Sequence, residues 1–189
     1  MKELEQKIIS EGKLLEGNIL KVGSFLNQQV DTKLLKLMAK EVKRLFKKEN
    51  ITKVLTIESS GIPFAAAIAL ELEVPFVFAK KGMASNLSGD LVSAQVYSYT
   101  HKKVNEIFAS REYIKESDSI LIVDDFLANG EALRGLISLV EQCNAKVVGC
   151  VVEIEKEFQQ GGNTLRSEGY KVEALASIKQ IDANTIYFN

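Results

Sequence analysis

Five short apolar runs, interspersed with segments of helical periodicity, limit this chain most strongly to one class of fold. The runs lie at residues 51–58, 74–79, 119–125 and 146–154, with a weaker one at 170–178. Runs of this length that are rich in Val and Ile are typical of buried strands. Buried strands that alternate with helices predict a parallel sheet covered by helices on both faces, with right-handed crossovers. We therefore expect an α/β fold.

The segments between these runs have the patterns of helices. Asp31 can cap a helix whose apolar face includes Leu34, Met38 and Val42, while its lysines face water. The Ala-rich segment 62–72 and the segment from Gly130 to about residue 143 predict two further helices. The charged start of the chain, residues 1–7, is typical of an amphipathic helix and not of a secretory signal.

The alternation breaks after the second run. A small, polar segment at 82–90 precedes an alternating segment at 93–99, a turn at 101–103 that contains the lone histidine, His101, and a returning strand at 104–110. This pattern predicts an antiparallel hairpin outside the parallel core. Because a long polar loop on a hairpin can cover a site, residues 82–110 form a candidate lid. His101 is expected in solvent, since it lies at the hairpin tip.

Composition excludes several classes of protein. With 189 residues and 46% hydrophobic content, the chain can bury the core of one domain. Its net charge of −1 indicates no nucleic-acid or anionic-membrane surface, and no apolar run approaches the roughly 20 residues of a membrane span. A cytoplasmic protein is expected. Cys143 and Cys150 lack metal-ligand spacing and are interpreted as reduced core thiols.

The richest chemistry lies where the third run ends in two adjacent acids, Asp124 and Asp125, before a turn of small residues and a helix. Carboxylates can accept hydrogen bonds from a ribose diol, and the start of a helix can hold a phosphate. Walker A and dinucleotide loops are excluded because their glycine patterns are missing. A phosphoacceptor or Mg²⁺ site would not explain the small residues. A sugar-phosphate site is favoured, and a purely structural turn stays open.

Residues 120–132, Ile-Leu-Ile-Val-Asp-Asp-Phe-Leu-Ala-Asn-Gly-Glu-Ala, closely resemble the phosphoribosyl diphosphate motif of type I phosphoribosyltransferases. The resemblance also includes residues 20–29, 56–62 and 153–159, and it extends over essentially the full length to the bacterial branch that acts on xanthine. It implies the type I phosphoribosyltransferase fold, a parallel sheet with flanking helices and a hairpin lid. One domain, 1–189, would carry the lid at 82–110 and a base-binding hood formed by 1–30 and 155–189. A homodimer is also implied.

The resemblance implies a role for each part of the donor site. Asp124 and Asp125 would hold the ribose hydroxyls, and the 5-phosphate would be wrapped by Ala128, Asn129, Gly130, Glu131 and Ala132. The small side chains agree with this role, because backbone N–H groups must approach the phosphate closely. The diphosphate would be bound by Ser59, Ser60, Gly61, Lys80 and Lys81.

Other features of the diphosphate site follow from the same resemblance. Mg²⁺ would be carried with the donor, and no resident metal site is expected. In the family the Ser59–Gly61 loop commonly contains a non-proline cis peptide. A serine N-cap of the following helix is a compatible interpretation. Either lysine alone could equally be a solvated charge at the start of a loop.

Purine recognition is assigned by the resemblance to Leu20, Asn27, Lys156 and Phe158. An amide offers a donor and an acceptor, and a lysine favours an oxopurine such as xanthine over adenine. Considered alone, Lys156 would be a surface lysine. Phe158 could stack on the base or pack in the core.

The implied activity is transfer of phosphoribose to xanthine in purine salvage, which gives xanthosine 5-monophosphate and diphosphate. Ala128 stands where hypoxanthine and guanine transferases usually carry an aspartate, so the catalytic base is unknown. Adenine transferases share the alanine. Adenine, guanine or hypoxanthine therefore stay open as substrates. A non-catalytic regulator that senses phosphoribosyl diphosphate is the other alternative, but neither length nor charge supplies a nucleic-acid-binding part.

Overall fold

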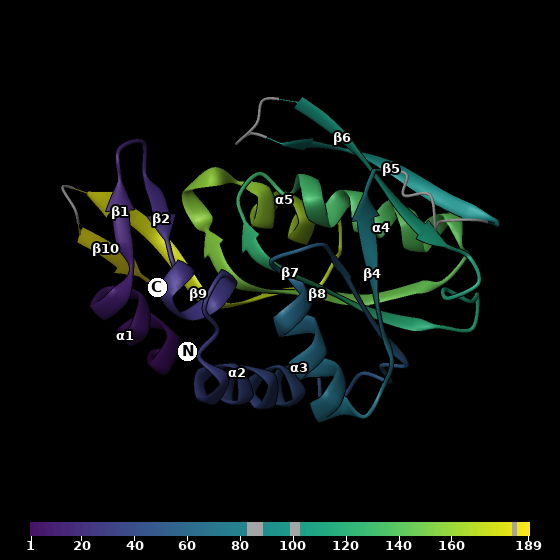
Figure 1. Cartoon of the computed structure of the whole chain (residues 1–189), viewed down its shortest axis with the longest axis horizontal. Helices are drawn as coiled ribbons and strands as arrows, with labels where there is room; N and C mark the ends of the chain where they lie inside the picture. The colour runs from purple at the N-terminus through teal and green to yellow at the C-terminus, as the bar shows by residue number, and fades with distance from the viewer. Residues whose placement is uncertain (83–88, 99–102, 183–184) are drawn as a thin grey trace.

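The structure is a computed structural model that describes residues 1–82, 89–98, 103–182 and 185–189. Within these ranges, eight strands form one sheet in the order β10-β9-β8-β7-β3-β4-β6-β5 (Figure 1). His101 and residues 83–88 of the predicted lid loop lie outside the described residues.

Five strands make the parallel part of the sheet, as the apolar runs predict. They are β3 (Lys53–Ile57), β4 (Phe76–Lys81), β7 (Ser119–Leu127), β8 (Lys146–Lys156) and β9 (Val172–Asp182). β7 lies between β3 and β8, which places the two acids at a central position of the sheet.

Antiparallel strands extend both edges. The predicted lid hairpin is β5 (Leu91–Ser98) and β6 (Lys103–Ser110), and β6 pairs with the end of β4 at Lys80 and Lys81. Lys103 was expected in the turn but already belongs to β6, because it pairs with Ser98. At the other edge, β10 (Thr185–Phe188) pairs with β9.

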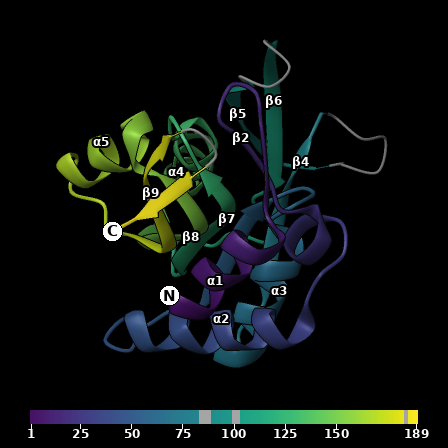
Figure 2. The same cartoon turned by 90° about the vertical axis from the view of Figure 1, so that its left-hand side faces the viewer.

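Helices cover both faces, as expected. On one face lie α1 (Lys2–Glu11), α2 (Thr32–Leu45) and α3 (Ile62–Leu72), and on the other lie α4 (Glu131–Gln142) and α5 (Gly161–Ser167). Figure 2 shows the same two layers after a 90° turn. Asp31 caps α2 as predicted, because its Oδ1 accepts hydrogen bonds from the N–H groups of Lys33 and Leu34, both over 3.1 Å. Among the described residues, no helix is long and apolar enough to cross a membrane.

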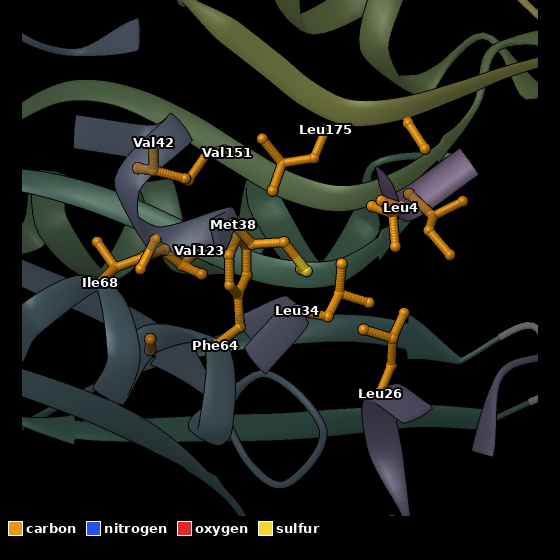
Figure 3. Packing of buried hydrophobic residues seen from close by; sticks show 14 of the residues in the cluster. Leu4, Leu26, Leu34, Met38, Val42, Phe64, Ile68, Val123, Val151 and Leu175 are labelled. Atoms are coloured by element: carbon orange, nitrogen blue, oxygen red, sulfur yellow. The ribbon is translucent and has the colours of Figure 1, made fainter. Parts of the chain in front are cut away.

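The sheet separates two apolar layers. Leu121 and Val123 of β7 pack with α1, α2 and α3, whereas Ile120 and Ile122 pack with α4 and the β5–β6 hairpin. Figure 3 shows the first layer, where Phe64 of α3 and Met38 of α2 lie near Val123. Because successive side chains of a strand point to opposite faces, the continuous apolar run of β7 serves both layers.

The N-terminal segment forms a small subdomain outside the main sheet. A two-stranded hairpin, β1 (Lys13–Leu15) and β2 (Ile19–Lys21), is followed by a π-helical turn at Gly23–Asn27. The N-terminal ammonium group donates a hydrogen bond to the carbonyl oxygen of Leu175 in β9, which fixes α1 to the sheet. The predicted hood and lid boundaries are not tested by this arrangement and stay predictions.

Both cysteines are free and buried, in agreement with the prediction of core thiols. Burial raises the pKa of the Cys150 thiol to about 12 and also raises that of Cys143. Since the thiolate is the reactive form, neither thiol suits nucleophilic chemistry near neutral pH.

Candidate functional site

The loop between β7 and α4 lies at the carboxyl end of a central parallel strand (Figure 1). Gly130 forms the N-cap of α4 with a left-handed φ of 87°. Glycine adopts this conformation without steric cost, so the chain can turn directly from strand to helix. The first N–H groups of a helix have no partners within it, which leaves donors at this loop for an anion.

A cavity of about 760 Å³ borders this loop. All seven residues predicted to hold the sugar and the 5-phosphate line it: Asp124, Asp125, Ala128, Asn129, Gly130, Glu131 and Ala132. Tyr97 of β5 and residues 103–107 of β6 also line it, so the predicted lid hairpin contributes to the same cavity. The volume falls in the usual range for small-molecule sites.

The two acids are linked through the backbone. Oδ1 of Asp124 accepts a hydrogen bond from the N–H of Asp125 over 3.0 Å, and Oδ1 of Asp125 accepts one from the N–H of Phe126 over 2.9 Å. Asp124 is 5% exposed. Burial, followed by the nearby charge of Asp125, raises the pKa of Asp124 well above its usual range. The pair can therefore hold a proton as well as accept hydrogen bonds, which suits a diol.

A third acid lies beside this pair. Glu153 of β8 occupies the register position opposite Asp125, because Asp124 pairs with Val152 and Phe126 pairs with Ile154. Its side chain is 2% exposed, and its Oε2 has no hydrogen-bond partner among the described residues. Burial, and then the charges of Asp125 and Asp124, raise the pKa of Glu153 well above its usual range.

The predicted diphosphate loop joins β3 to α3. The peptide bond between Glu58 and Ser59 is cis, as the family resemblance implies. Ser60 lines the cavity, whereas Ser59 and Gly61 are absent from its described lining. The alternative of a serine N-cap is wrong, because Gly61 caps α3 without any side-chain hydrogen bond from the described residues.

Gly61 is required by a close approach of two strand ends. A Cβ atom built there would lie 2.3 Å from Oγ1 of Thr56 and 3.4 Å from Oδ1 of Asp124. Thr56 is fully buried, and its Oγ1 has no hydrogen-bond partner in the described part of the chain. The Ser59–Gly61 loop and the acid pair are therefore packed directly against each other.

The two predicted lysines differ in position. Lys81 lines the cavity, and its backbone N–H donates a hydrogen bond to Oε1 of Glu58 over 2.6 Å. Lys80 is absent from the described lining and pairs in register with Phe108 of β6. Lys81 also lowers the pKa of Asp124, although less than burial raises it. Of the two, Lys81 is the cation that faces the acids.

None of the predicted purine residues belongs to the described lining of this cavity, and two of them, Leu20 and Lys156, belong to or contact the N-terminal hairpin. Nζ of Lys156 donates a hydrogen bond to the carbonyl oxygen of Asn18, over 3.1 Å. Leu20 of β2 is buried, and Asn27 is exposed at the end of the π-helical turn. Phe158 is 36% exposed and belongs to neither core cluster of the described residues, so the alternative of core packing is wrong. Lys156 and the β1–β2 hairpin are brought together, while the base-binding roles stay predictions.

Comparison with known proteins identifies the family. A family model described as a phosphoribosyl transferase domain matches residues 24–182. The chain belongs to the phosphoribosyltransferase family. This phosphoribosyltransferase is 51% identical over 188 residues to the xanthine phosphoribosyltransferases of Bacillus cereus strain AH187 and of Bacillus anthracis, a match that covers 100% of this chain and 95% of each relative. The expected fold class and family are thus confirmed.

Solved structures agree with this fold. Adenine phosphoribosyltransferase from Giardia lamblia, complexed with 9-deazaadenine, superposes with a TM-score of 0.80 at 23% identity, covering 94% of this phosphoribosyltransferase and 98% of that chain. The adenine phosphoribosyltransferase of Thermoanaerobacter pseudethanolicus gives a TM-score of 0.77 at 20% identity, covering 93% and 98%. At these identities the likeness concerns the fold alone.

Sequence reasoning missed two buried polar residues of this phosphoribosyltransferase, Glu153 and Thr56. A signal for Glu153 was present, since an acid within an apolar strand next to the acid-bearing strand is unusual. Thr56 gave no such signal, because threonine is common in strands.

Proposed function

We propose that this phosphoribosyltransferase transfers the 5-phosphoribosyl group from 5-phosphoribosyl 1-diphosphate to N9 of xanthine. The bond from C1 of the ribose to the diphosphate oxygen breaks, and a bond from C1 to N9 forms. Xanthosine 5-monophosphate and diphosphate are the products, and the N9 proton passes to solvent. The observation that carries the proposal is that the acid pair, the small-residue loop and Lys81 line the same cavity.

The donor half of the reaction is supported by the geometry of this cavity. Asp124 and Asp125 are adjacent carboxyl groups for the two ribose hydroxyls, and the 128–132 loop leads into the start of α4 for the phosphate. Fixing the sugar at two points orients C1 for attack, which lowers the entropic part of the barrier.

Departure of the diphosphate requires positive charge and hydrogen-bond donors. Lys81 and Ser60 line the same cavity as the acids. Charge builds up on the leaving oxygens while the ribose becomes cationic, so an ammonium group beside those oxygens favours the transition state over the ground state. Residues 103–107 of the hairpin line this cavity too, and water excluded by them would strengthen these interactions.

Mg²⁺ is proposed to arrive on the diphosphate of the donor. No group of three or more His, Cys, Asp or Glu side chains among the described residues could hold a metal ion. The carboxylates and open space of the cavity fit an ion that brings its own phosphate ligands, because Mg²⁺ commonly takes one or two carboxylates plus substrate oxygens. When bound, the ion would neutralise charge on the leaving group.

Xanthine as the acceptor rests on the 51% identity to xanthine phosphoribosyltransferases over the full chain. Lys156 supplies a cationic donor suited to an exocyclic oxygen. No carboxylate stands at Ala128, and the acidity of xanthine lessens the need for a general base. Cytoplasmic location and a homodimer remain part of the proposal, on the family resemblance.

A purine-by-purine assay tests the proposal. Purified protein is incubated with Mg²⁺, 5-phosphoribosyl 1-diphosphate and, in separate reactions, xanthine, guanine, hypoxanthine or adenine, and nucleotides are separated by chromatography. The fastest product is expected from xanthine. Faster formation of adenosine monophosphate would overturn the base assignment, and no nucleotide from any purine would overturn the enzymatic function.

A further inference from the structure

A glycine outside the predicted site contacts the phosphate loop. The backbone N–H of Gly161, the first residue of α5, donates a hydrogen bond to the carbonyl oxygen of Ala128 over 3.1 Å. Gly161 is buried and does not belong to the described lining of the cavity. It therefore touches the loop from outside the space that the donor would occupy.

The contact leaves no room for a side chain. A Cβ atom built on Gly161 would lie 2.4 Å from the carbonyl oxygen of Ala128, 2.5 Å from the carbonyl carbon of Asn129 and 2.6 Å from the nitrogen of Gly130. All three atoms belong to the backbone, so no rotation of a side chain can relieve the clash. Any larger residue at position 161 must move either the phosphate loop or α5.

From the side of the loop, Gly130 lies in ordinary van der Waals contact with α5. A Cβ atom built on Gly130 would lie 3.5 Å from the Cα atom of Gly161 and 3.5 Å from Cδ1 of Leu165. Leu165 is fully buried among residues of the α4 layer. The turn that leads into α4 is thus packed against the first helical turn of α5.

Arg166, in the last turn of α5, anchors this short helix to the sheet. Arg166 donates two hydrogen bonds to the carboxylate of Glu155 in β8, over 2.8 and 2.6 Å, and a third to the carbonyl oxygen of Val172 over 3.1 Å. The side chain of Glu155 is 3% exposed. A Cβ atom at Gly162 would lie 1.8 Å from Oε1 of this carboxylate, so the backbone also packs closely on the ion pair. A bidentate pair with a buried partner holds a fixed geometry.

We propose that Gly161 is a positioning residue for phosphoribosyl diphosphate: its backbone supports residues 128–130 from outside the cavity and fixes where their N–H groups meet the 5-phosphate. The Glu155–Arg166 pair holds Gly161 in place. This inference rests on the proposed function, since it assigns the supported loop to the 5-phosphate of the donor.

The expected effect is selective for the donor. Displacing a binding group by about 1 Å can cost on the order of a hundredfold in rate, so a methyl group at position 161 should act strongly through the loop. For Gly161→Ala we expect the KM for phosphoribosyl diphosphate to rise by roughly ten- to a hundredfold, with a much smaller change in the KM for xanthine. Ribose 5-phosphate, titrated by calorimetry, should lose affinity in parallel.

Gly149→Ala provides the matched control. A Cβ atom at Gly149 would lie 2.6 Å from Cε1 of Phe46, in the half of β8 away from Lys156. Both variants should therefore unfold at lower temperature, but Gly149→Ala should keep the KM values of the unsubstituted protein. Arg166→Lys is the second test variant, because lysine cannot form the bidentate pair with Glu155 and introduces no clash. It should raise the donor KM in the same direction, and it tests the inference if Gly161→Ala fails to fold.

The outcomes separate this inference from the proposed function. The positioning role of Gly161 would be overturned by an unchanged donor KM in folded Gly161→Ala, or by an equal rise in the KM values for donor and xanthine. If Gly161→Ala fails to fold, an unchanged donor KM in Arg166→Lys would overturn it. Absence of nucleotide formation by the unsubstituted protein would instead overturn the proposed function. In that case, weaker ribose 5-phosphate binding by Gly161→Ala would still support the positioning role.

Discussion

The ammonium group of Lys156 donates a hydrogen bond to the carbonyl oxygen of Asn18, over 3.1 Å, and so ties the end of β8 to the turn of the β1–β2 hairpin. Partial burial lowers the pKa of this lysine. An ammonium group that donates a hydrogen bond to a backbone carbonyl oxygen can donate it instead to a carbonyl oxygen of a purine. The contact therefore links the position of the hairpin to the proposed recognition of the base.

Lys156→Ala should raise the KM for xanthine by about ten- to a hundredfold, because a hydrogen bond from a charged group contributes about 1.5–3 kcal/mol. The KM for phosphoribosyl diphosphate should change little. Steady-state kinetics with each substrate varied in turn measure both values. Lys146→Ala is the control, since Lys146 is exposed at the other end of β8. If the two variants had the same KM for xanthine, the role of Lys156 in binding the base would be contradicted.

Asp125→Asn keeps an oxygen that can accept the 2.9 Å hydrogen bond from the N–H of Phe126 but removes the charge. Weaker binding of the ribose hydroxyls should lower kcat/KM for the donor by about ten- to a hundredfold. Initial rates at saturating xanthine measure this value. Glu116→Gln, an exposed substitution of the same kind, should leave it unchanged. The ribose role would be refuted by equal donor kinetics in both variants.

Gly130→Ala should combine a folding effect with a binding effect. Its φ of 87° makes alanine unfavourable by about 1–2 kcal/mol, and the new methyl group would also meet Gly161 at 3.5 Å. Gly169→Ala is a matched control, because Gly169 has a φ of 95° and a Cβ atom there would have no described neighbour within 4 Å. Both variants should lose similar stability in urea unfolding. A raised donor KM is expected in Gly130→Ala alone, and normal donor kinetics there would count against the phosphate role.

Glu153→Gln should change how stability depends on pH. Because the pKa of Glu153 is raised in the folded protein above its unfolded value of 4.5, the folded state binds the proton more tightly. The stability that this carboxyl contributes is fully present below pH 4.5. It is lost as the pH rises through the folded pKa. Glutamine does not ionise, so the Glu153→Gln variant does not lose this stability as the pH rises.

Urea unfolding at several pH values measures this difference. The stability of Glu153→Gln relative to the unsubstituted protein should rise as the pH increases above the unfolded value of 4.5. Glu173→Gln provides a control on the neighbouring strand, at a partly exposed carboxyl. Parallel stability curves for Glu153→Gln and the unsubstituted protein would show that Glu153 does not titrate as its burial indicates.

The parallel sheet and the cavity-lining loop after β7 could be predicted because their signals are local. The apolar run of β7 gives the strand, and the Asp124–Asp125 pair with its small-residue turn gives the site at the strand's end. Glu153 could not be placed beside them, since its position depends on the register between β7 and β8. Register is set by packing of whole strands, which a single segment does not encode.

The proposed purine-binding residues were harder to place, because their positions also depend on tertiary contacts. Lys156 lies more than a hundred residues along the chain from Leu20 and Asn27, and only folding brings the β1–β2 hairpin to the end of β8. The predicted serine N-cap of α3 was wrong because the N-cap is Gly61, which packs against Thr56 with no room for a side chain. In both places tertiary contacts, rather than local propensity, determine the structure.

The division of the core by the sheet has an evolutionary consequence. Leu121 and Val123 serve the layer that carries α1, while Ile120 and Ile122 serve the layer that carries α4. Side chains on opposite faces of a sheet do not share packing partners, so substitutions in the two layers should be nearly additive. Lineages could therefore accumulate changes beneath the N-terminal hairpin while the layer under the 128–132 loop stayed constant, so the proposed acceptor site could diverge without changing the proposed donor site.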